Sequence, residues 1–197
     1  MSDVSLMLTG REKCAFMPNL TAVNPRSPIM KTGLQWLWIT IVFVLLDQLT
    51  KHLAVEYISP YEPIEVMPFF NLVLRYNTGA AFSFLADAGG WQVLFFSTIS
   101  IVISLGILYW MYTLPAKNSW LSCALALILA GALGNLYDRI MLGKVVDFID
   151  WYIGQHHWPA FNIADSVILL GAVMMLFDGF VSPEKRSSDS NQSKNND

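Results

Sequence analysis

The sequence predicts an all-α membrane protein with four transmembrane helices, a small β-rich element outside the membrane, and a short outer segment between spans three and four. Composition is the first reason: 54% of the 197 residues are hydrophobic and only 14% are charged, against about 25% charged in an average soluble domain. The second reason is that four apolar runs approach the roughly 20 residues that a helix needs to cross the hydrocarbon core. These runs cover about residues 34–53, 91–114, 120–137 and 163–181.

The two ends of the chain differ from this apolar middle, residues 31–181, which we expect to form one membrane domain. Residues 1–30 contain Pro18, Pro25 and Pro28 and have no apolar core of signal-peptide length. We expect them to form a disordered cytoplasmic leader, with Met30 as an alternative start. Residues 182–197 are rich in Ser, Asn, Asp and Lys, a composition too polar to order itself. They are predicted to form a polar cytoplasmic tail.

The positions of Lys and Arg predict the orientation, because basic residues in short loops tend to stay in the cytoplasm. Four spans place both termini on one side of the membrane. That side, with the link between spans two and three, carries Arg11, Lys13, Arg26, Lys31, Lys117, Lys185, Arg186 and Lys194. The other side carries only Lys51, Arg75, Arg139 and Lys144. We therefore expect both termini in the cytoplasm.

Two segments are expected on the outer side. Residues 55–90 contain the β-prone runs Ile64–Met67 and Asn71–Tyr76, bounded by prolines and a glycine, which predict a small β-rich element on the membrane surface. Residues 141–161 mix apolar and aromatic side chains with acids and histidines. We expect them to form an interfacial segment, with a short helix, that joins spans three and four.

An acidic residue near the outer end of the first span needs a partner, since a charge at the membrane centre costs on the order of 3 kcal/mol. Lys51 follows Asp47 by four residues, so both lie on one helical face. The two residues form an ion pair that anchors the helix end, or they do this and also support a neighbouring site.

A polar cluster ends the third span. Asn135 and Asp138 are three residues apart, and Asn135 and Arg139 are four apart, so one helical face can present an amide and either charge. Arg139 also suits a helix C-terminus, where the backbone dipole favours a cation. The cluster is therefore either a cap that ends the span or part of a site.

Two further acids flank the last outer segment. Asp147 stands alone among Val145, Val146 and Phe148, whereas Asp165 follows Asn162 at the start of the fourth span. Asn162 can cap that helix, and the Asp165 carboxylate can accept its free N–H groups. Capping alone would explain Asn162 and Asp165, but it leaves Asp147 without a role.

Asp147 and Asp165 could converge at the membrane surface and share one proton, because two carboxyls in one site cannot easily both ionise. The ionised partner would take a proton from water as the water attacks a carbonyl. The protonated partner would polarise that carbonyl and later protonate the leaving amine. A helix N-terminus favours charge on Asp165 and an apolar setting favours neutral Asp147, although coupled groups titrate as a pair.

Other functions fit less well. His156 and His157 are adjacent and no His-Glu-x-x-His motif is present, so a zinc hydrolase is disfavoured and we expect neither a metal nor another cofactor. Cys14 and Cys123 suggest neither a disulfide nor a metal site. A proton-coupled transporter would place acids at the middle of the membrane and show internal repeats. This sequence does not have that pattern, so a transporter is disfavoured. A third alternative, an assembly factor that catalyses no reaction, stays open.

Five motifs in order give the chain a recognisable pattern. They are Asp47-Gln48-Leu49-Thr50-Lys51, Asn77-Thr78-Gly79-Ala80-Ala81-Phe82, Gly134-Asn135-Leu136-Tyr137-Asp138-Arg139, Val146-Asp147-Phe148 and Phe161-Asn162-Ile163-Ala164-Asp165. Over about residues 34–179 the chain resembles bacterial lipoprotein signal peptidase, or signal peptidase II. The resemblance implies an aspartic peptidase of the bacterial inner membrane. It implies that the enzyme removes the signal peptide of a prolipoprotein by cutting before a cysteine that carries a diacylglyceryl group.

The resemblance also assigns residues. Asp147 and Asp165 match the catalytic pair, and the residues expected to bind substrate or orient the site are Asp47, Lys51, Asn77, Gly79, Asn135, Asp138, Arg139 and Asn162. It places the active site near the periplasmic face, with membrane lipids and the prolipoprotein as partners and no nucleic acid. We expect a monomer. Phe82 and Trp158 are expected to cover the site or to act as interfacial anchors.

Overall fold

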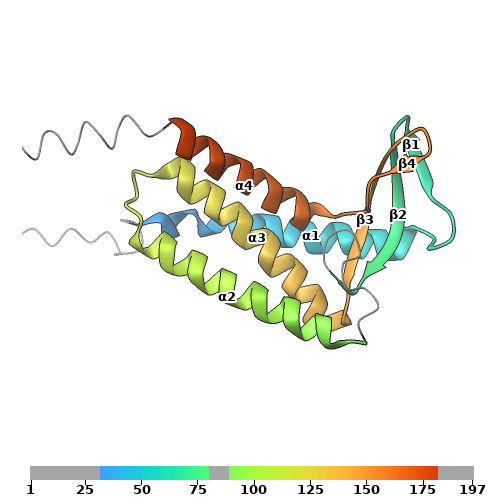
Figure 1. Ribbon diagram of the computed structural model, residues 1–197, viewed down its shortest axis with the longest axis horizontal. Coiled ribbons are helices and arrows are strands. Elements are labelled where there is room, and N and C mark those ends of the chain that lie inside the picture. Colours follow the sequence, from blue (N-terminus) through green and yellow to red (C-terminus); the bar gives the residue numbers. More distant parts are fainter. Residues whose placement is uncertain (1–31, 80–88, 182–197) are drawn as a thin grey trace, which may run out of the picture.

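The computed structural model describes residues 32–79 and 89–181, and Figure 1 shows a bundle of helices with a small sheet at one end. The predictions for residues 1–30, Phe82 and the tail from residue 182 fall outside the described ranges. The elements are the 3₁₀ helix η2 (Gly33–Trp36), α1 (Leu37–Tyr57), β1 (Ile64–Met67), β2 (Phe70–Asn77), α2 (Trp91–Thr113), α3 (Ser119–Leu142), β3 (Val145–Ile153), β4 (His156–His157) and α4 (Ile163–Val181).

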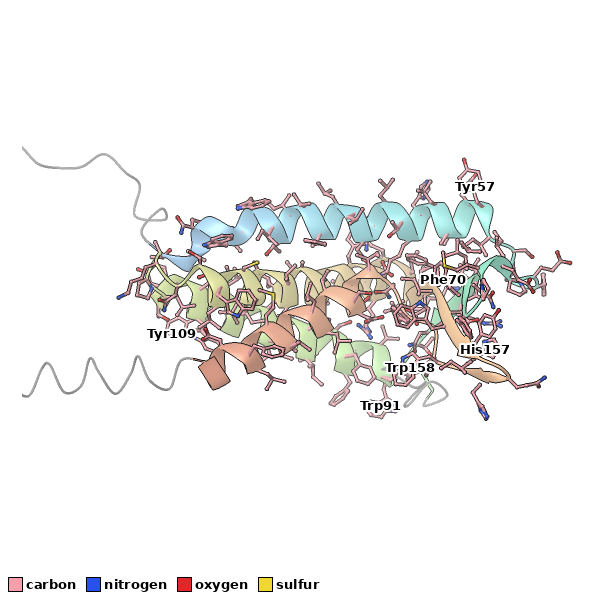
Figure 2. All side chains as sticks on the ribbon, turned by 90° about the horizontal axis from the view of Figure 1, so that it is seen from above. Tyr57, Phe70, Trp91, Tyr109, His157 and Trp158 are labelled. Atoms are coloured by element: carbon pink, nitrogen blue, oxygen red, sulfur yellow. The ribbon has the colours of Figure 1, made fainter. Side chains whose placement is uncertain are left out.

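Three of the described helical segments are long and apolar enough to cross a membrane: Gly33–Tyr57, Trp91–Thr113 and Ser119–Leu142. They match the first three predicted spans in position. Helix α4 coincides with the fourth predicted run, but that it crosses the membrane remains a prediction. The outer faces of the helices present large apolar side chains, for example Leu45, Leu94 and Leu105, each more than half exposed. Side chains of this kind suit contact with lipid (Figure 2).

Helix α3 is the centre of the bundle, since it packs against α1, α2 and α4. Its buried core includes Leu125 and Leu129, which pack with Met111 of α2. Small residues let α4 approach closely, because a Cβ at Gly131 of α3 would collide with the carbonyl oxygen of Ala164. A Cβ at Gly171 of α4 would likewise come within 2.6 Å of a carbonyl oxygen of α3. Close backbone packing through small residues is typical of membrane helices.

The four strands form one antiparallel sheet in the order β1-β2-β3-β4. The β-rich element expected within residues 55–90 is present as β1 and β2. The short helix expected within residues 141–161 is wrong, because β3 occupies residues 145–153. This stretch is rich in β-branched and aromatic residues, which favour a strand when a partner is available. Its partner β2 lies about 70 residues earlier in the chain.

The end of α3 directs the chain into β3. Gly143 adopts the left-handed conformation (φ 69°), and its N–H donates to the carbonyl oxygen of Arg139 at 3.1 Å, as in a glycine C-cap. The helix therefore ends at Leu142 rather than at Tyr137, where the apolar run ends. The first residues of β3 then lie beside the end of α1, and the two elements pack together.

Candidate active site

Asp147 and Asp165 belong to one hydrogen-bond network at the sheet end of the bundle. Asn162 Nδ2 donates to Asp147 Oδ1 at 2.7 Å, and Asn135 Nδ2 donates to Asp165 Oδ1 at 2.8 Å. The two asparagines are themselves linked, since Asn162 Nδ2 lies 3.3 Å from Asn135 Oδ1. Residues from α3, β3 and the start of α4 therefore hold the two acids around a common pair of amides.

Asp165 is also fixed by the start of its own helix. Its backbone N–H donates to Asn162 Oδ1 at 3.0 Å, and its Oδ2 accepts the backbone N–H of Asn162 at 3.3 Å. This reciprocal pair is a capping box with Asn and Asp in the two roles. Capping therefore occurs as the sequence suggested, and it leaves Asp165 Oδ1 turned toward Asn135.

Asp147 is 3% exposed on strand β3. Besides Asn162, Asn77 at the end of β2 donates to its Oδ2 at 3.2 Å. Burial, together with the charge of nearby Asp165, raises the pKa of Asp147 to about 7, although the two amide hydrogen bonds act in the opposite direction. Near pH 7 this carboxyl can therefore either hold or release a proton.

A buried charge cluster lies behind the acids. Lys51 Nζ is 2.9 Å from Asp47 Oδ2, 3.0 Å from Asp138 Oδ2 and 3.0 Å from Asn135 Oδ1. The side chains of Lys51, Asp47 and Asp138 are only 3%, 1% and 2% exposed. The ion pair expected between Asp47 and Lys51 is thus present, and it includes Asp138 as a third member.

The two carboxylates of this cluster hold the backbone next to the candidate catalytic acids. Asp47 Oδ1 accepts the N–H of Ala164 at 2.8 Å, one residue before Asp165. Asp138 Oδ2 accepts the N–H of Val146 at 3.1 Å, one residue before Asp147. The cluster therefore connects α1 and α3 to both acid-bearing segments.

Sequence reasoning missed Gln48. Its Nε2 lies 3.1 Å from Asp47 Oδ2, 3.0 Å from Asp138 Oδ1 and 3.2 Å from the carbonyl oxygen of Gly134. An uncharged amide inside an apolar span between Asp47 and Lys51 was the available signal. Gly134 permits this contact, because a Cβ there would come within 2.6 Å of Asp47 Oδ2.

Arg139 connects α3 to the end of β2. Its Nη2 donates to the carbonyl oxygen of Gly79 at 3.1 Å, and its guanidinium lies 5.5 Å from the ring centroid of Phe96. The N–H of Gly79 in turn donates to Asn77 Oδ1 at 2.9 Å. Arg139 and Gly79 therefore lie at the edge of the network and help to position Asn77 against Asp147.

A second polar group lies further along the sheet. Asn71 Nδ2 donates to Asp150 Oδ2 at 3.2 Å, and His157 Nδ1 lies 3.0 Å from both carboxylate oxygens of Asp150. Asp150 and His157 are among the acids and histidines of residues 141–161, to which the sequence assigned no role. In the described part of the chain, no group of three His, Cys, Asp or Glu residues has the arrangement of a metal site.

A cavity of about 490 Å³ joins the two polar groups. Residues of β2 and β3 line it, including Asp147, Asp150 and Asn71. Asp147 and Asp150 are three residues apart and would face opposite sides of a regular strand. The N–H groups of Phe148 and Ile149 both donate to the carbonyl oxygen of Phe161, so two residues of β3 oppose one. This bulge turns both acids toward the same cavity.

The chain combines helices long enough to cross a membrane with two buried carboxyl groups that one hydrogen-bond network joins beside a polar cavity. This combination defines a membrane protein with an enzyme-like site. Two solved structures described as bacterial membrane enzymes share this fold at 33% sequence identity. One has a TM-score of 0.68 and covers 75% of this chain and 88% of its own. The other has a TM-score of 0.65 and covers 76% and 94%. The class of protein is therefore a membrane enzyme.

The family is shown by sequence. Residues 39–181 match the model of the signal peptidase (SPase) II family. The chain is 48% identical over 159 residues to the lipoprotein signal peptidase of Alteromonas mediterranea, covering 81% of this chain and 87% of that protein. It is 49% identical over 161 residues to that of Yersinia pseudotuberculosis, covering 82% and 95%. The chain belongs to the signal peptidase II family, a family of peptidases.

Proposed function

We propose that this chain is a membrane aspartic peptidase that removes signal peptides from prolipoproteins, cutting before the cysteine that carries a diacylglyceryl group. The observation that carries the proposal is the network in which Asn162 and Asn135 hold Asp147 and Asp165 together. The relatives named lipoprotein signal peptidase support the choice of substrate.

The mechanism uses one proton on the pair of aspartates. The ionised carboxylate accepts a proton from water as the water oxygen attacks the carbonyl carbon of the peptide bond. The protonated carboxyl donates a hydrogen bond to that carbonyl oxygen, and a proton then passes to the departing nitrogen of the cysteine. The raised pKa of Asp147 supports a shared proton at neutral pH. Because the two groups are coupled, the proton belongs to the pair.

The remaining polar residues have positioning or binding roles. Asp47, Lys51 and Asp138 form the buried ion cluster that holds the backbone beside each acid. Asn77 and Gly79 lie at the end of β2, where an extended substrate can approach the sheet. Arg139 holds the Gly79 carbonyl oxygen and thereby the approach to Asp147.

The exposed apolar side chains and the positions of the helix ends support an arrangement in the membrane. Helix α4 presents Leu169, Leu176 and Phe177, each more than half exposed, which supports a fourth span. In Figure 1 the start of α1 and the end of α4 lie at the end of the bundle opposite the sheet. This supports both termini in the cytoplasm of a bacterium and the site near the periplasmic face of the inner membrane. The signal helix of the substrate would lie in lipid against the bundle, and the enzyme would act as a monomer.

The test is cleavage of a purified precursor by the full chain in detergent or liposomes. We expect the product to begin with the diacylglyceryl cysteine, as measured by intact-mass spectrometry. The control is the same precursor without the lipid, which should stay uncut. No cleavage of the modified precursor, cleavage at another bond, or equal cleavage of both precursors would contradict the proposal.

A further inference from the structure

The cavity beside Asp147 contains a buried acceptor that the proposed chemistry does not use. Asn71 is 7% exposed and lines the cavity. Its Nδ2 donates to Asp150, while its Oδ1 has no hydrogen-bond partner among the described residues. The amide cannot be turned over, because the Asp150 carboxylate would then face another acceptor. Leaving a buried acceptor unpaired is unfavourable, and a bound donor would remove this cost.

Asp150 adds further acceptor capacity at the same place. The side chain of Asp150 is 10% exposed, and an ionised carboxylate has about four acceptor positions. Asn71 and His157 occupy only part of them. His157 is held against the carboxylate and also stacks on Tyr152, with ring centroids 5.1 Å apart. This end of the cavity therefore presents fixed acceptors to whatever binds there.

The cation in the cavity wall does not reverse this preference. Arg75 is exposed and pairs across the strands with Asp147, whereas Asn71 pairs with Asp150. The charge of Arg75 is therefore screened by water and lies at the Asp147 end of the cavity. At the Asn71 end, a carboxylate on the ligand would meet Asp150 and the unpaired oxygen. A hydroxyl, amide or ammonium group would donate to them.

The place of the cavity indicates which part of a substrate it holds. It is built by the sheet, which lies at one end of the bundle beside the end of α1 (Figure 1), and Figure 2 shows His157 and Trp158 at that end, far from Tyr109. A signal helix is apolar and belongs in lipid. The polypeptide after the cleavage point continues into water, so it is the part that suits a polar cavity at the sheet end of the bundle.

We propose that this cavity is a subsite for the first residues after the lipid-bearing cysteine, and that Asn71 and Asp150 make it prefer donor side chains over carboxylates. The inference rests on the proposed function and adds a specificity that the catalytic pair does not supply. Loss of a hydrogen bond to a buried acceptor, or a carboxylate placed against Asp150, should change kcat/KM by about tenfold.

The experiment uses the full chain and lipid-modified precursors that differ at one position. The second or the third residue of the mature part is Asn in one precursor and Asp in its match. We expect kcat/KM to favour the Asn precursor by about tenfold at one of these positions. In Asp150→Asn the ratio should fall toward one, and in Asn71→Leu it should fall partly. The control Glu65→Gln removes an exposed charge from β1, outside the cavity, and should keep the wild-type ratio.

Each ratio compares two substrates on one enzyme preparation, so a variant with less folded protein still gives a valid value. Cleavage of both precursors at equal rates by the wild type would overturn the subsite while leaving the peptidase proposal intact. A preference for the Asp precursor would assign the cavity to Arg75 and would also overturn it. An unchanged ratio in both variants would do the same. If the wild type cleaves no precursor at all, the proposed function itself fails.

Discussion

Lys51 gives a prediction whose size can be derived from the structure. Lys51→Met keeps an unbranched side chain but removes the cation that lies 2.9 Å from Asp47 and 3.0 Å from Asp138. Both carboxylates are at most 2% exposed, so water cannot replace the ammonium. Breaking a buried ion pair by removing one partner costs about 3 to 5 kcal/mol. For a chain of this size, that lowers the Tm by roughly 6 to 20 °C.

The assay is thermal unfolding of the purified protein in detergent micelles, followed by tryptophan fluorescence. Lys117→Met is the matched control, because Lys117 is exposed in the link between α2 and α3, and its Tm should stay near that of the wild type. The triple variant Lys51→Met, Asp47→Asn, Asp138→Asn should recover much of the loss, since it leaves no uncompensated charge. A Tm for Lys51→Met within about 2 °C of the control would refute the reasoning.

Four further predictions concern the site. Because the pKa of Asp147 is raised to about 7, kcat/KM should fall about tenfold per pH unit above that value; a flat profile to pH 9 would contradict it. The native pKa lies above the ordinary value of about 3.9, so folding stability should decrease between about pH 4 and pH 7. Asp147→Asn should reduce this decrease in melts across that range, and an unchanged slope would count against it. Gly134→Ala should lower Tm and activity because its Cβ displaces the Asp47 carboxylate, whereas Gly106→Ala on α2, with nothing within 4 Å, should be neutral; equal melting of the two would exclude this contact. Asn162→Ala should lower kcat by at least about a hundredfold, since the Asp147 carboxylate and the backbone N–H of Asp165 each lose a partner, and near-normal turnover would remove Asn162 from the site.

Short-range patterns predicted much of the fold. The apolar runs predicted the positions of the helices, since length and hydropathy are properties of a continuous segment. The Asp47–Lys51 pair and the capping of α4 by Asn162 followed from spacings of three and four residues on a helix. Each of these contacts joins residues within one turn of each other, so the sequence contains the whole signal.

Contacts between distant segments could not be predicted in the same way. Residues 145–153 form β3 because β2 provides a strand edge to pair with. The residues near this segment in the sequence contain no signal for that partner. The bulge that turns Asp150 toward the cavity depends on Phe161. Gln48 acquires its role only when α3 brings Asp138 and Gly134 against α1. In each case the partner lies in a segment that is distant in the sequence but close in the folded chain.

The most direct test of the central claim compares wild type with Asp147→Asn and Asp165→Asn on one lipid-modified precursor. The two carboxylates are proposed to act as a unit, so either replacement should lower kcat by about ten-thousandfold or more, with membrane insertion and Tm confirming a folded protein. Turnover by either folded variant at more than about one tenth of the wild-type rate would show that water is activated without a shared proton between these two acids.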